Sequence, residues 1–276
     1  LRGCMRAPAK PARRRERLDR LLVARGLAPS REQAARLILA GQVFVDGQRV
    51  DKAGQQVGAD APVEIRTRPP FVSRGGEKLA HALEAFRISV AGRTCLDVGA
   101  STGGFTHCLL SRGAARVYAV DVGRGQLDAA LRADPRVVLM EKTNARTLTA
   151  AVFPVEPDLA TVDVAFISLE KVLRAVMGAL ADPAEAVVLV KPQFEVGKGL
   201  VGKGGVVRDP AQHRAVVGRL ARFAILHGWH VLGGAASPLT GPKGNREFFL
   251  YLSRRGRTVA ELDALIARVT QGANGT

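Results

Sequence analysis

Hydrophobic and polar positions along the chain follow two different rhythms, one before residue 70 and one after it. In the first part, residues 16–26 (ERLDRLLVARG) carry leucines at helical spacing, and Gly26 ends that pattern. Ser30 and Gln33 stand three residues apart, as in the capping box that opens a helix, and the apolar pattern that follows ends at Gly41. The pattern therefore predicts two short helices near the start of the chain.

A hairpin signal follows the second predicted helix. VFVDGQRV places two short β-prone runs around Asp46–Gly47, a dipeptide typical of tight hairpin turns. PVEI at 62–65 predicts a third strand. Two prolines then end the pattern in RTRPP, residues 66–70, and predict a short, stiff linker between two domains.

From Phe71 onward, apolar runs of strand length alternate with amphipathic helical patterns. Strands are expected near residues 94–99, 116–121, 136–140, 158–164, 186–191, 230–236 and 246–252. One intervening helix is expected to begin at Asp209–Pro210, and the last helix at a capping box of Thr258 and Glu261. This βαβ rhythm predicts an α/β domain built on a parallel, doubly wound sheet.

The charge balance of the chain is strongly basic. It has 41 Lys and Arg against 25 Asp and Glu, a net charge of +16, and a pI of about 10.9. Residues 1–70 alone carry 15 basic and 7 acidic side chains. Such an excess favours a polyanionic partner, most simply a nucleic acid, although a genome that prefers arginine would give the same balance.

Cysteine usage and hydropathy narrow the class of protein. Cys4, Cys95 and Cys108 are odd in number and lack metal-ligand spacing, so we expect reduced thiols, no metal site and a cytoplasmic location. The sequence contains no run of about 18 apolar residues that would predict a transmembrane helix. The first residues, LRGCMRAPAKPARRR, lack the apolar segment of a secretory signal, and we expect residues 1–15 to form a disordered basic arm.

Two helices followed by a hairpin on a basic background resemble the S4 RNA-binding domain. The resemblance implies a small α+β domain over residues 16–66 that binds RNA, followed by a linker at 67–71. Basic side chains at helical spacing and in the hairpin are candidates for phosphate contacts. These candidates are Arg13, Arg17, Arg20, Arg31, Arg36, Arg49 and Lys52.

A glycine-rich turn separates a predicted strand from a predicted helix in CLDVGASTGGFTHCLLSRG, residues 95–113. Glycines let a ligand approach the backbone, and a helix N-terminus offers free N–H groups. The spacing of Gly99, Gly103 and Gly104 differs from the dinucleotide pattern G-x-G-x-x-G. The next strand ends in Asp121, whose carboxylate can accept both hydroxyls of a ribose. Turn, strand and terminal acid together resemble the S-adenosylmethionine site of a Rossmann-like methyltransferase.

Two other stretches near the predicted crevice allow more than one interpretation. Asn144, in EKTNAR after the third strand, is either a neighbour of the adenine or an ordinary turn residue. GKGLVGKG at 197–204 nearly spells a Walker phosphate-binding loop, but Gly204 stands where Ser or Thr must bind Mg²⁺. We therefore do not expect nucleotide cleavage at this loop.

Four charged residues stand at the ends of predicted elements. Asp163 and Lys191 end two buried strands, so both face the crevice at the carboxyl ends of a doubly wound sheet. Lys78 lies near the start of the first helix of this domain, and Glu247 lies at the start of the last strand. Their order along the chain matches the K-D-K-E tetrad of FtsJ-like ribose 2′-O-methyltransferases.

The phrases around these residues are similar to those of the TlyA family, in which an S4 domain precedes an FtsJ-like domain and for which the name haemolysin is also used. They are SRGGEKL, LDVGASTGGFT, DVGRGQL, TNAR, FISL, LVKPQFEVGKG, GGVVRDP and ASPLTGPKGNREFFLYL. The resemblance covers nearly the whole chain from about residue 15 and implies a methyltransferase domain at 72–276. The family commonly has Asp-Leu-Ser-Phe where this chain has Asp163-Val164-Ala165-Phe166, so one serine hydroxyl is missing from that turn.

The resemblance implies an S-adenosylmethionine-dependent enzyme that methylates cytidine ribose in 23S and also 16S ribosomal RNA on ribosomal subunits. It implies a methyl-donor site formed by Gly99, Ser101, Gly103, Gly104, Phe105, Asp121, Asn144 and Asp163.

The chemistry of the reaction suits the four charged residues. A ribose 2′-hydroxyl is a poor nucleophile, whereas a sulfonium methyl group is already a good electrophile, so the enzyme must align them and ease removal of the hydroxyl proton. Lys191 would act on the hydroxyl, helped by a lowered pKa if desolvation and a second cation disfavour its charge. Lys78 would supply that cation or stabilise the alkoxide. Asp163 would position Lys191, and Glu247 would orient Lys78 or the ribose.

Two other functions fit parts of the sequence. A membrane-active haemolysin would need an apolar span or a membrane-binding helix, and neither is visible in the sequence. A non-catalytic factor of ribosome assembly would bind RNA through the S4 domain but would have no use for an intact tetrad. The sequence therefore favours the enzyme, and we expect it to act as a monomer.

Overall fold

The computed structural model describes residues 15–65, 70–197 and 199–271, and it divides the chain into two compact units between Pro69 and Pro70. The candidate Arg13 and nearly all of the expected basic arm lie outside the described residues. One hydrophobic core fills the N-terminal unit, and two cores lie within the C-terminal unit. Each unit is therefore stabilised by burial of its own apolar side chains.

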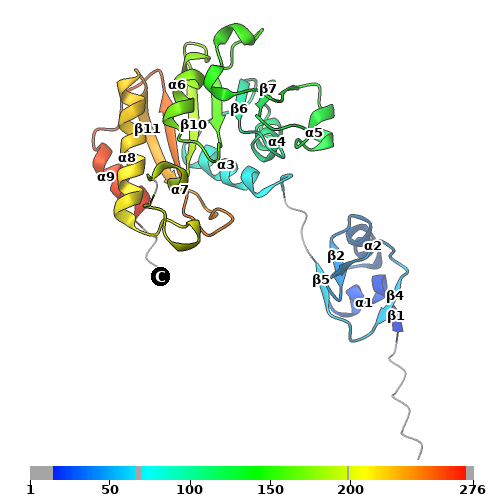
Figure 1. The fold of residues 1–276 in the computed structure, drawn as a ribbon. Coiled ribbons are helices and arrows are strands. Elements are labelled where there is room, and N and C mark those ends of the chain that lie inside the picture. Colours follow the sequence, from blue (N-terminus) through cyan, green and yellow to red (C-terminus); the bar gives the residue numbers. More distant parts are fainter. Residues whose placement is uncertain (1–14, 66–69, 198, 272–276) are drawn as a thin grey trace, which may run out of the picture. The chain divides into compact units, whose positions relative to one another are not determined.

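The N-terminal unit packs two helices against short strands (Figure 1). Its elements are β1 (Arg15–Arg17), α1 (Leu18–Ala24), α2 (Arg31–Leu39), β2 (Val43–Val45), β3 (Gln48–Arg49), β4 (Gln56–Gly58) and β5 (Val63–Ile65). The predicted helix start is confirmed, because the Ser30 side chain accepts a hydrogen bond from the Gln33 N–H. The hairpin is confirmed as well, since β2 pairs with β3 and also with β5. The pairing of β1 with β4 has no signal in the sequence pattern.

The C-terminal unit is built on a seven-stranded sheet. Its strands are β6 (Thr94–Val98), β7 (Arg116–Val120), β8 (Val137–Met140), β9 (Leu159–Val162), β10 (Glu185–Val190), β11 (His230–Ala236) and β12 (Phe248–Ser253). Its α-helices are α3 (Arg74–Ala85), α4 (Gly104–Ser111), α5 (Ala129–Ala133), α6 (Glu170–Gly178), α7 (Pro192–Glu195), α8 (Pro210–Leu226) and α9 (Leu262–Thr270). Three short 3₁₀ turns are η1 (Ala145–Thr147), η2 (Ala150–Val152) and η3 (Lys203–Gly205).

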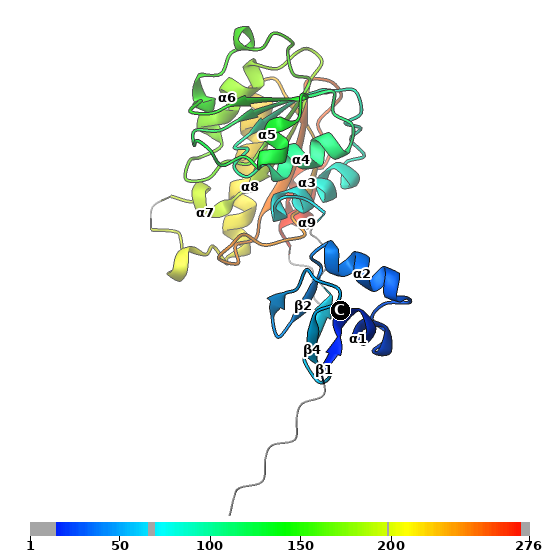
Figure 2. The same ribbon diagram turned by 90° about the vertical axis from the view of Figure 1, so that its right-hand side faces the viewer.

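Alternate residues of each central strand face opposite layers of helices. In β10, Val188 and Val190 belong to the core under α6, α8 and α9, while Val187 and Leu189 belong to the core under α3, α4 and α5. Figure 1 shows these layers on either side of the sheet, and Figure 2 looks onto the layer of α3, α4 and α5. A strand that is buried on both faces needs apolar residues at every position, which explains the unbroken run at 186–190.

The strand order of the sheet is β11-β12-β10-β9-β6-β7-β8. Neighbouring strands from β10 to β8 are parallel, as predicted, but β12 runs antiparallel to both β10 and β11. The expectation of a wholly parallel sheet is therefore wrong for β12. The chain passes from β11 to β12 through residues 237–247 without a helix, and parallel strands need a longer crossover than this.

The last helix begins later than predicted. It follows Glu261, and no side chain caps it, so the predicted capping box is wrong. The hydroxyl of Thr258 instead accepts a hydrogen bond of 3.3 Å from the backbone N–H of Val231 on the edge strand β11. By contrast, Asp209 caps α8 as predicted, and Pro210 occupies the first position of that helix.

Cys95 and Cys108 are buried and unpaired. Burial raises the pKa of the Cys95 thiol to about 12 and that of the Cys108 thiol to about 11. Both cysteines therefore behave as apolar core residues near neutral pH. Within the described part of the chain, no helix is long and apolar enough to cross a membrane, and no group of three or more His, Cys, Asp or Glu side chains could hold a metal ion.

Candidate active site

The carboxyl ends of the parallel strands form the edge at which several predicted residues meet. The chain runs outward from β6 through β7 to β8 and then returns to β9 on the other side of β6. The turns after β6 and β9 therefore diverge, and such a point in a doubly wound sheet leaves a crevice for a ligand. Gly99 begins the turn after β6, Asp163 directly follows β9, and Lys191 directly follows β10.

Gly99 lets the two diverging turns approach closely at their bases. Its φ angle is +85°, and a Cβ atom at this position would lie 2.2 Å from the carbonyl oxygen of Asp163. A side chain is excluded both by the backbone conformation and by this neighbour. Two residues later, the backbone N–H of Ser101 donates a 2.8 Å hydrogen bond to Oδ2 of Asp121. The glycine-rich turn is thus tied to the residues that follow β9 and β7.

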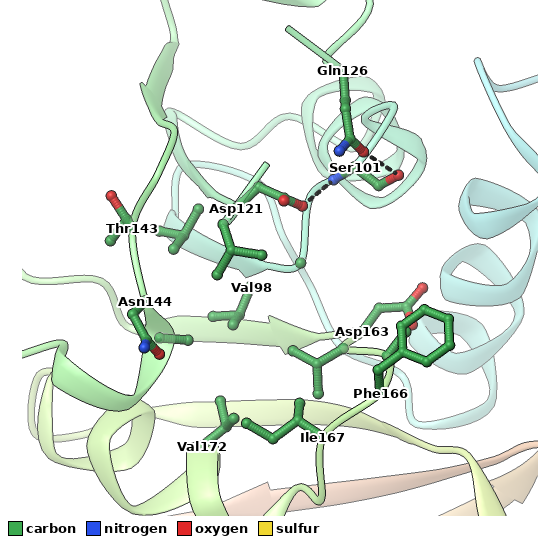
Figure 3. A pocket seen from close by; sticks show the side chains of 16 residues that line it. Val98, Ser101, Asp121, Gln126, Thr143, Asn144, Asp163, Phe166, Ile167 and Val172 are labelled. Atoms are coloured by element: carbon green, nitrogen blue, oxygen red, sulfur yellow. Dashed lines mark hydrogen bonds between the residues drawn. The ribbon is translucent and has the colours of Figure 1, made fainter. Parts of the chain in front are cut away.

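A cavity of about 350 Å³ opens between these turns. Figure 3 shows its polar side chains, with Asn144 and Asp163 on opposite walls and Ser101 and Gln126 above Asp121. Five of the predicted donor residues line this cavity, which we call the donor cavity. They are Gly99, Ser101, Asp121, Asn144 and Asp163.

The polar side chains of the donor cavity also hold the local backbone. Oδ1 of Asp121 accepts a 2.7 Å hydrogen bond from the backbone N–H of Gly123. Oδ1 of Asn144 accepts a 3.1 Å hydrogen bond from the backbone N–H of Arg146 and so caps η1. Asn144 is therefore a turn residue that also faces the cavity. Oδ1 of Asp121 keeps a second lone pair for a ligand. Oδ1 of Asn144 also accepts a 3.2 Å hydrogen bond from Nε of Arg146, so Asn144 can bind a ligand through the NH₂ group of its amide.

Three predicted donor residues do not line the donor cavity. Gly104 and Phe105 line a second cavity on the other side of the glycine-rich turn. Gly103 lines neither cavity: its φ angle is +95°, and a Cβ atom there would lie 2.4 Å from the side chain of Leu131. Gly103 thus lets the turn pack against α5.

The second cavity, of about 490 Å³, contains all four tetrad residues and meets the donor cavity at Asp163. We call it the acceptor cavity. The Nζ atom of Lys191 lies 2.5 Å from Oδ1 of Asp163. The Nζ atom of Lys78 lies 2.6 Å from Oε2 of Glu247. The tetrad is therefore two ion pairs, one at the boundary between the cavities and one deeper in the acceptor cavity.

The antiparallel direction of β12 brings Glu247 to this edge of the sheet. Phe248 pairs with Val190, so the residue before β12 stands beside the residue after β10. Glu247 and Lys191 are those two residues. Lys78 comes from α3, which packs against α4 directly behind the glycine-rich turn. Four different elements thus deliver the four side chains to one cavity.

The arrangement suits the transfer of a group from a ligand in the donor cavity to a hydroxyl group in the acceptor cavity, with removal of the hydroxyl proton. Lys191 faces the acceptor cavity, while its partner Asp163 also faces the donor cavity. An amine at this boundary can hold a hydroxyl group by a hydrogen bond and accept its proton when neutral. The side chains of Lys191 and Asp163 are 15% and 22% exposed, so both remain within reach of ligands.

Asp97, which no motif in the sequence singles out, lies fully buried beneath the glycine-rich turn. Its carboxylate accepts hydrogen bonds from the hydroxyls of Thr106 on α4 and Thr161 on β9, at 2.7 and 3.2 Å. Burial, together with the nearby charge of Asp163, raises the pKa of Asp97 to about 7, against the opposing effect of the two hydroxyls. The one available signal was an acid inside the apolar run of CLDV.

Glu195 is a second buried acid that the motifs do not reveal. Its Oε1 accepts a 2.7 Å hydrogen bond from the backbone N–H of Leu169, and its Oε2 accepts bonds of 2.9 Å from Ser168 and Arg219. Burial raises the pKa of Glu195 above its ordinary value, although these donors oppose the rise. Because Glu195 lies four residues after Lys191, one carboxylate ties the turn after β9 to the turn after β10.

The N-terminal unit carries the remaining predicted residues on its surface. The described ones are exposed or half-buried: Arg17, Arg20, Arg31, Arg36, Arg49 and Lys52. Arg36 forms a surface ion pair with Glu32 one turn away on α2. Arg17 and Arg31 come from different elements and share one carboxylate, that of Asp19.

Comparisons with known proteins agree with this division of the chain. The family model of the FtsJ-like methyltransferase matches residues 71–254, and that of the S4 domain matches residues 16–63. A relative from Mycobacterium tuberculosis (strain H37Rv), named 16S/23S rRNA (cytidine-2′-O)-methyltransferase TlyA, is 55% identical over 87% of this chain and 90% of its own length. Hemolysin A from Brachyspira hyodysenteriae is 40% identical over 85% of this chain and 98% of its own length.

A solved structure extends these matches to the fold. The structure of a protein provisionally described as a hemolysin from Streptococcus thermophilus aligns with a TM-score of 0.71 and 40% identity. The alignment covers 94% of this chain and 95% of that one.

Proposed function

The chain belongs to the FtsJ-like methyltransferase family, and we propose that it transfers the methyl group of S-adenosylmethionine to the 2′-hydroxyl of cytidine ribose in ribosomal RNA. It is an S-adenosylmethionine-dependent methyltransferase that carries an S4 domain. The observation that supports this reaction best is the tetrad of two ion pairs in a cavity that adjoins the donor cavity at Asp163. The name of the relative from M. tuberculosis supports the choice of cytidine ribose.

In this proposal the donor cavity holds S-adenosylmethionine. Asp121 accepts the hydroxyls of its ribose, the turn at Gly99 and Ser101 lies against its amino-acid part, and Asn144 faces its adenine. Asp163 stands beside the sulfonium, where its negative charge favours the positive donor over the neutral product. A side chain at residue 99 would push the two turns apart, so glycine at this position keeps the donor cavity next to the acceptor cavity.

The acceptor cavity holds the target ribose. Lys191 would bind the 2′-hydroxyl and, once its ammonium has released a proton to water, would take the hydroxyl proton as the oxygen–methyl bond forms and the sulfur–methyl bond breaks. Loss of the methyl group would leave a neutral thioether, and the positive charge of the donor would end on the ammonium of Lys191. Lys78 stabilises the developing alkoxide, and Glu247 fixes the position of Lys78.

The N-terminal domain, which we assign to residues 16–66, docks the enzyme on RNA, and the catalytic domain spans residues 72–276 with a linker at 67–71. We place the substrate within ribosomal subunits and the enzyme, as a monomer, in the cytoplasm where those subunits are found. The net charge of +16 supports a polyanionic partner of this kind.

A membrane-damaging activity is the second candidate, because the name hemolysin appears among the relatives. Leakage of dye from phospholipid vesicles by the purified protein tests it directly. An intact tetrad argues against the third candidate, a non-catalytic assembly factor, since RNA binding alone does not require a buried ion pair in a cavity.

The deciding experiment measures transfer of labelled methyl groups to unmodified large and small ribosomal subunits. We expect label in alkali-resistant 2′-O-methylcytidine with the native protein and its loss with Lys191→Ala. Calorimetry should show that this variant still binds S-adenosylmethionine, because Lys191 does not line the donor cavity. Donor binding without transfer to either subunit by the native protein would mean that the RNA substrate is wrong. Absence of donor binding would overturn the enzyme assignment for this chain.

A further inference from the structure

Asp19 is the one buried acid of the N-terminal unit among the described residues, and it is surrounded by arginine. The carboxylate accepts hydrogen bonds from Nε and Nη2 of Arg17 at 3.1 and 2.9 Å. Its Oδ2 also accepts a 3.1 Å bond from Nη2 of Arg31, twelve residues along the chain. A fourth bond comes from the backbone N–H of Arg20 at 2.9 Å. Three arginine residues, from β1, α1 and α2, thus donate to one side chain.

The two guanidinium groups are held close together, since both donate to the same oxygen. Like charges at such a distance repel each other, and flexible arginines would separate unless something held them. Asp19 supplies the opposite charge: the hydrogen bond from Arg17 in particular holds the pKa of that carboxyl well below its usual range. The carboxylate of Asp19 is therefore ionised near neutral pH.

Asp19 is buried, whereas Arg17 and Arg31 are exposed enough to contact a phosphate group of a partner. The Asp19 side chain is 6% exposed, whereas those of Arg17 and Arg31 are 40% and 54% exposed. The acid is therefore hidden, while both arginine side chains remain accessible to a partner. A planar arginine fork matches the oxygens of a phosphate group, and its affinity increases when the fork is already held in place.

We propose that Arg17 and Arg31 form one phosphate clamp for RNA and that Asp19 is the positioning residue that orders it. The proposal rests on the RNA-binding role of the N-terminal domain argued above. It predicts that removing the negative charge of Asp19 from this basic domain weakens RNA binding. Simple charge counting predicts the opposite, since a protein with one more net positive charge should bind a polyanion more tightly.

The N-terminal unit provides a matched control for this test. Glu32 forms an ion pair with Arg36 on α2, but its side chain is 76% exposed and that of Arg36 is 70% exposed. Glu32→Gln removes the same charge from the same unit as Asp19→Asn. An exposed pair of this kind imposes little order on its arginine. Any difference between the two variants therefore reports the buried position of Asp19 rather than the net charge.

The test measures the affinity of the full-length protein for unmodified large ribosomal subunits at several salt concentrations. We expect Asp19→Asn to weaken binding by about tenfold, as when two long side chains must be ordered during association. Glu32→Gln should leave affinity within about twofold of the native value. Arg17→Ala/Arg31→Ala should weaken binding and lower by about two the number of counterions released, which the dependence of affinity on salt concentration measures. Asp19→Asn should retain the native salt dependence, because both arginine cations remain.

The final comparison adds Asp19→Asn to the Arg17→Ala/Arg31→Ala variant. If Asp19 acts by ordering the clamp, this addition changes the affinity no further. A further loss of the same size would show a general structural role and overturn the proposal. Unchanged or tighter binding by Asp19→Asn, beside a weakened arginine double variant, would also overturn it. An unweakened arginine double variant would instead refute the RNA-binding role of this surface, while methyl transfer and donor binding test the enzyme separately.

Discussion

The ammonium group of Lys78 lies 2.6 Å from the carboxylate of Glu247, although 169 residues separate them along the chain. Their side chains are only 10% and 1% exposed. A buried ion pair rarely stabilises a fold more than apolar side chains of the same size, because both charges must be removed from water. The pair is therefore better explained by what it does in the acceptor cavity than by what it adds to stability.

Replacement of one or both members tests this view of the Lys78–Glu247 pair. Glu247→Leu leaves an unpaired buried ammonium and should lower the free energy of unfolding by about 3–5 kcal/mol. Lys78→Met/Glu247→Leu removes both charges and should recover most of that loss. Methyl transfer should nevertheless remain at least about 100-fold below the native rate, because the charge next to the alkoxide is gone. Unfolding can be followed by the fluorescence of Trp229, the chain's single tryptophan, which is buried in the C-terminal unit.

The double variant distinguishes a role of the pair in methyl transfer from a role in packing alone. Near-native methyl transfer by Lys78→Met/Glu247→Leu would show that the pair serves packing alone. Stability that stays as low as in Glu247→Leu would show that the cavity does not tolerate apolar side chains, and it would contradict the stability argument.

Gly99→Ala should weaken binding of S-adenosylmethionine by at least about tenfold, since the new methyl group would lie 2.2 Å from the carbonyl oxygen of Asp163 and push the two turns apart. Gly125→Ala is the matched control. Gly125 also has a positive φ angle, +71°, but a Cβ atom there meets nothing within 4 Å. Both variants incur a backbone cost of about 1 kcal/mol, so only the contact distinguishes them. Calorimetric titration should show equal donor affinity for Gly125→Ala and the native protein; equal weakening in both variants would refute the contact argument.

Glu195→Ala should lower the rate of methyl transfer by about tenfold at saturating donor and RNA, because small displacements of reacting groups are costly. The reason is that Glu195 joins the turn after β9, which begins at Asp163, to the turn that begins at Lys191. Donor affinity should change little, since Glu195 does not line the donor cavity.

Glu170→Ala is the control for Glu195→Ala. Glu170, the first residue of α6, also pairs with Arg219, at 2.9 Å, but its side chain is 35% exposed, whereas that of Glu195 is 1% exposed. The control should keep the native rate. A loss of rate in both variants would place the effect on Arg219 rather than on the buried carboxylate.

Part of the site follows from the sequence because it depends on periodicity alone. Asp163 and Lys191 end apolar runs, and the carboxyl ends of neighbouring parallel strands meet at one edge of a sheet. That rule predicts that both residues lie near the glycine-rich turn. The same rule fails for Glu247, which begins its strand and would lie at the opposite edge of a wholly parallel sheet. Only the antiparallel direction of β12 brings it beside Lys191. The short connection at residues 237–247, which contains no helix, is the one signal of this direction.

The remaining parts of the site depend on contacts between distant elements. Asp97 and Glu195 act through hydrogen bonds to residues 64 and 26 positions away, so no local pattern reveals them. Gly103 fits the motif of a ligand-binding turn, yet it faces a leucine of α5. Glycines in such a turn serve either ligand approach or close packing, and the sequence spacing does not distinguish the two.

Asp97 makes the stability of the C-terminal unit depend on pH. Its pKa is about 7 in the folded protein, against an ordinary value of 3.8, mainly because burial disfavours the carboxylate. The folded state therefore holds this proton more tightly than the unfolded state does. The stabilisation is fully present below pH 3.8 and is lost as the pH rises through about 7. Across that window Asp97 lowers the free energy of unfolding by at most about 1.4 kcal/mol for each pH unit.

Asp97→Asn removes the titrating group and keeps a side chain of similar size. We expect the native protein to lose stability relative to this variant between pH 5 and pH 7 and the difference to level off above pH 7. Urea unfolding at pH 5, 6, 7 and 8, followed by Trp229 fluorescence, measures the difference directly. Other titrating groups contribute to both proteins alike, so they cancel in the comparison. Parallel stability curves for the two proteins would show that Asp97 keeps its charge when buried, held by the hydroxyls of Thr106 and Thr161.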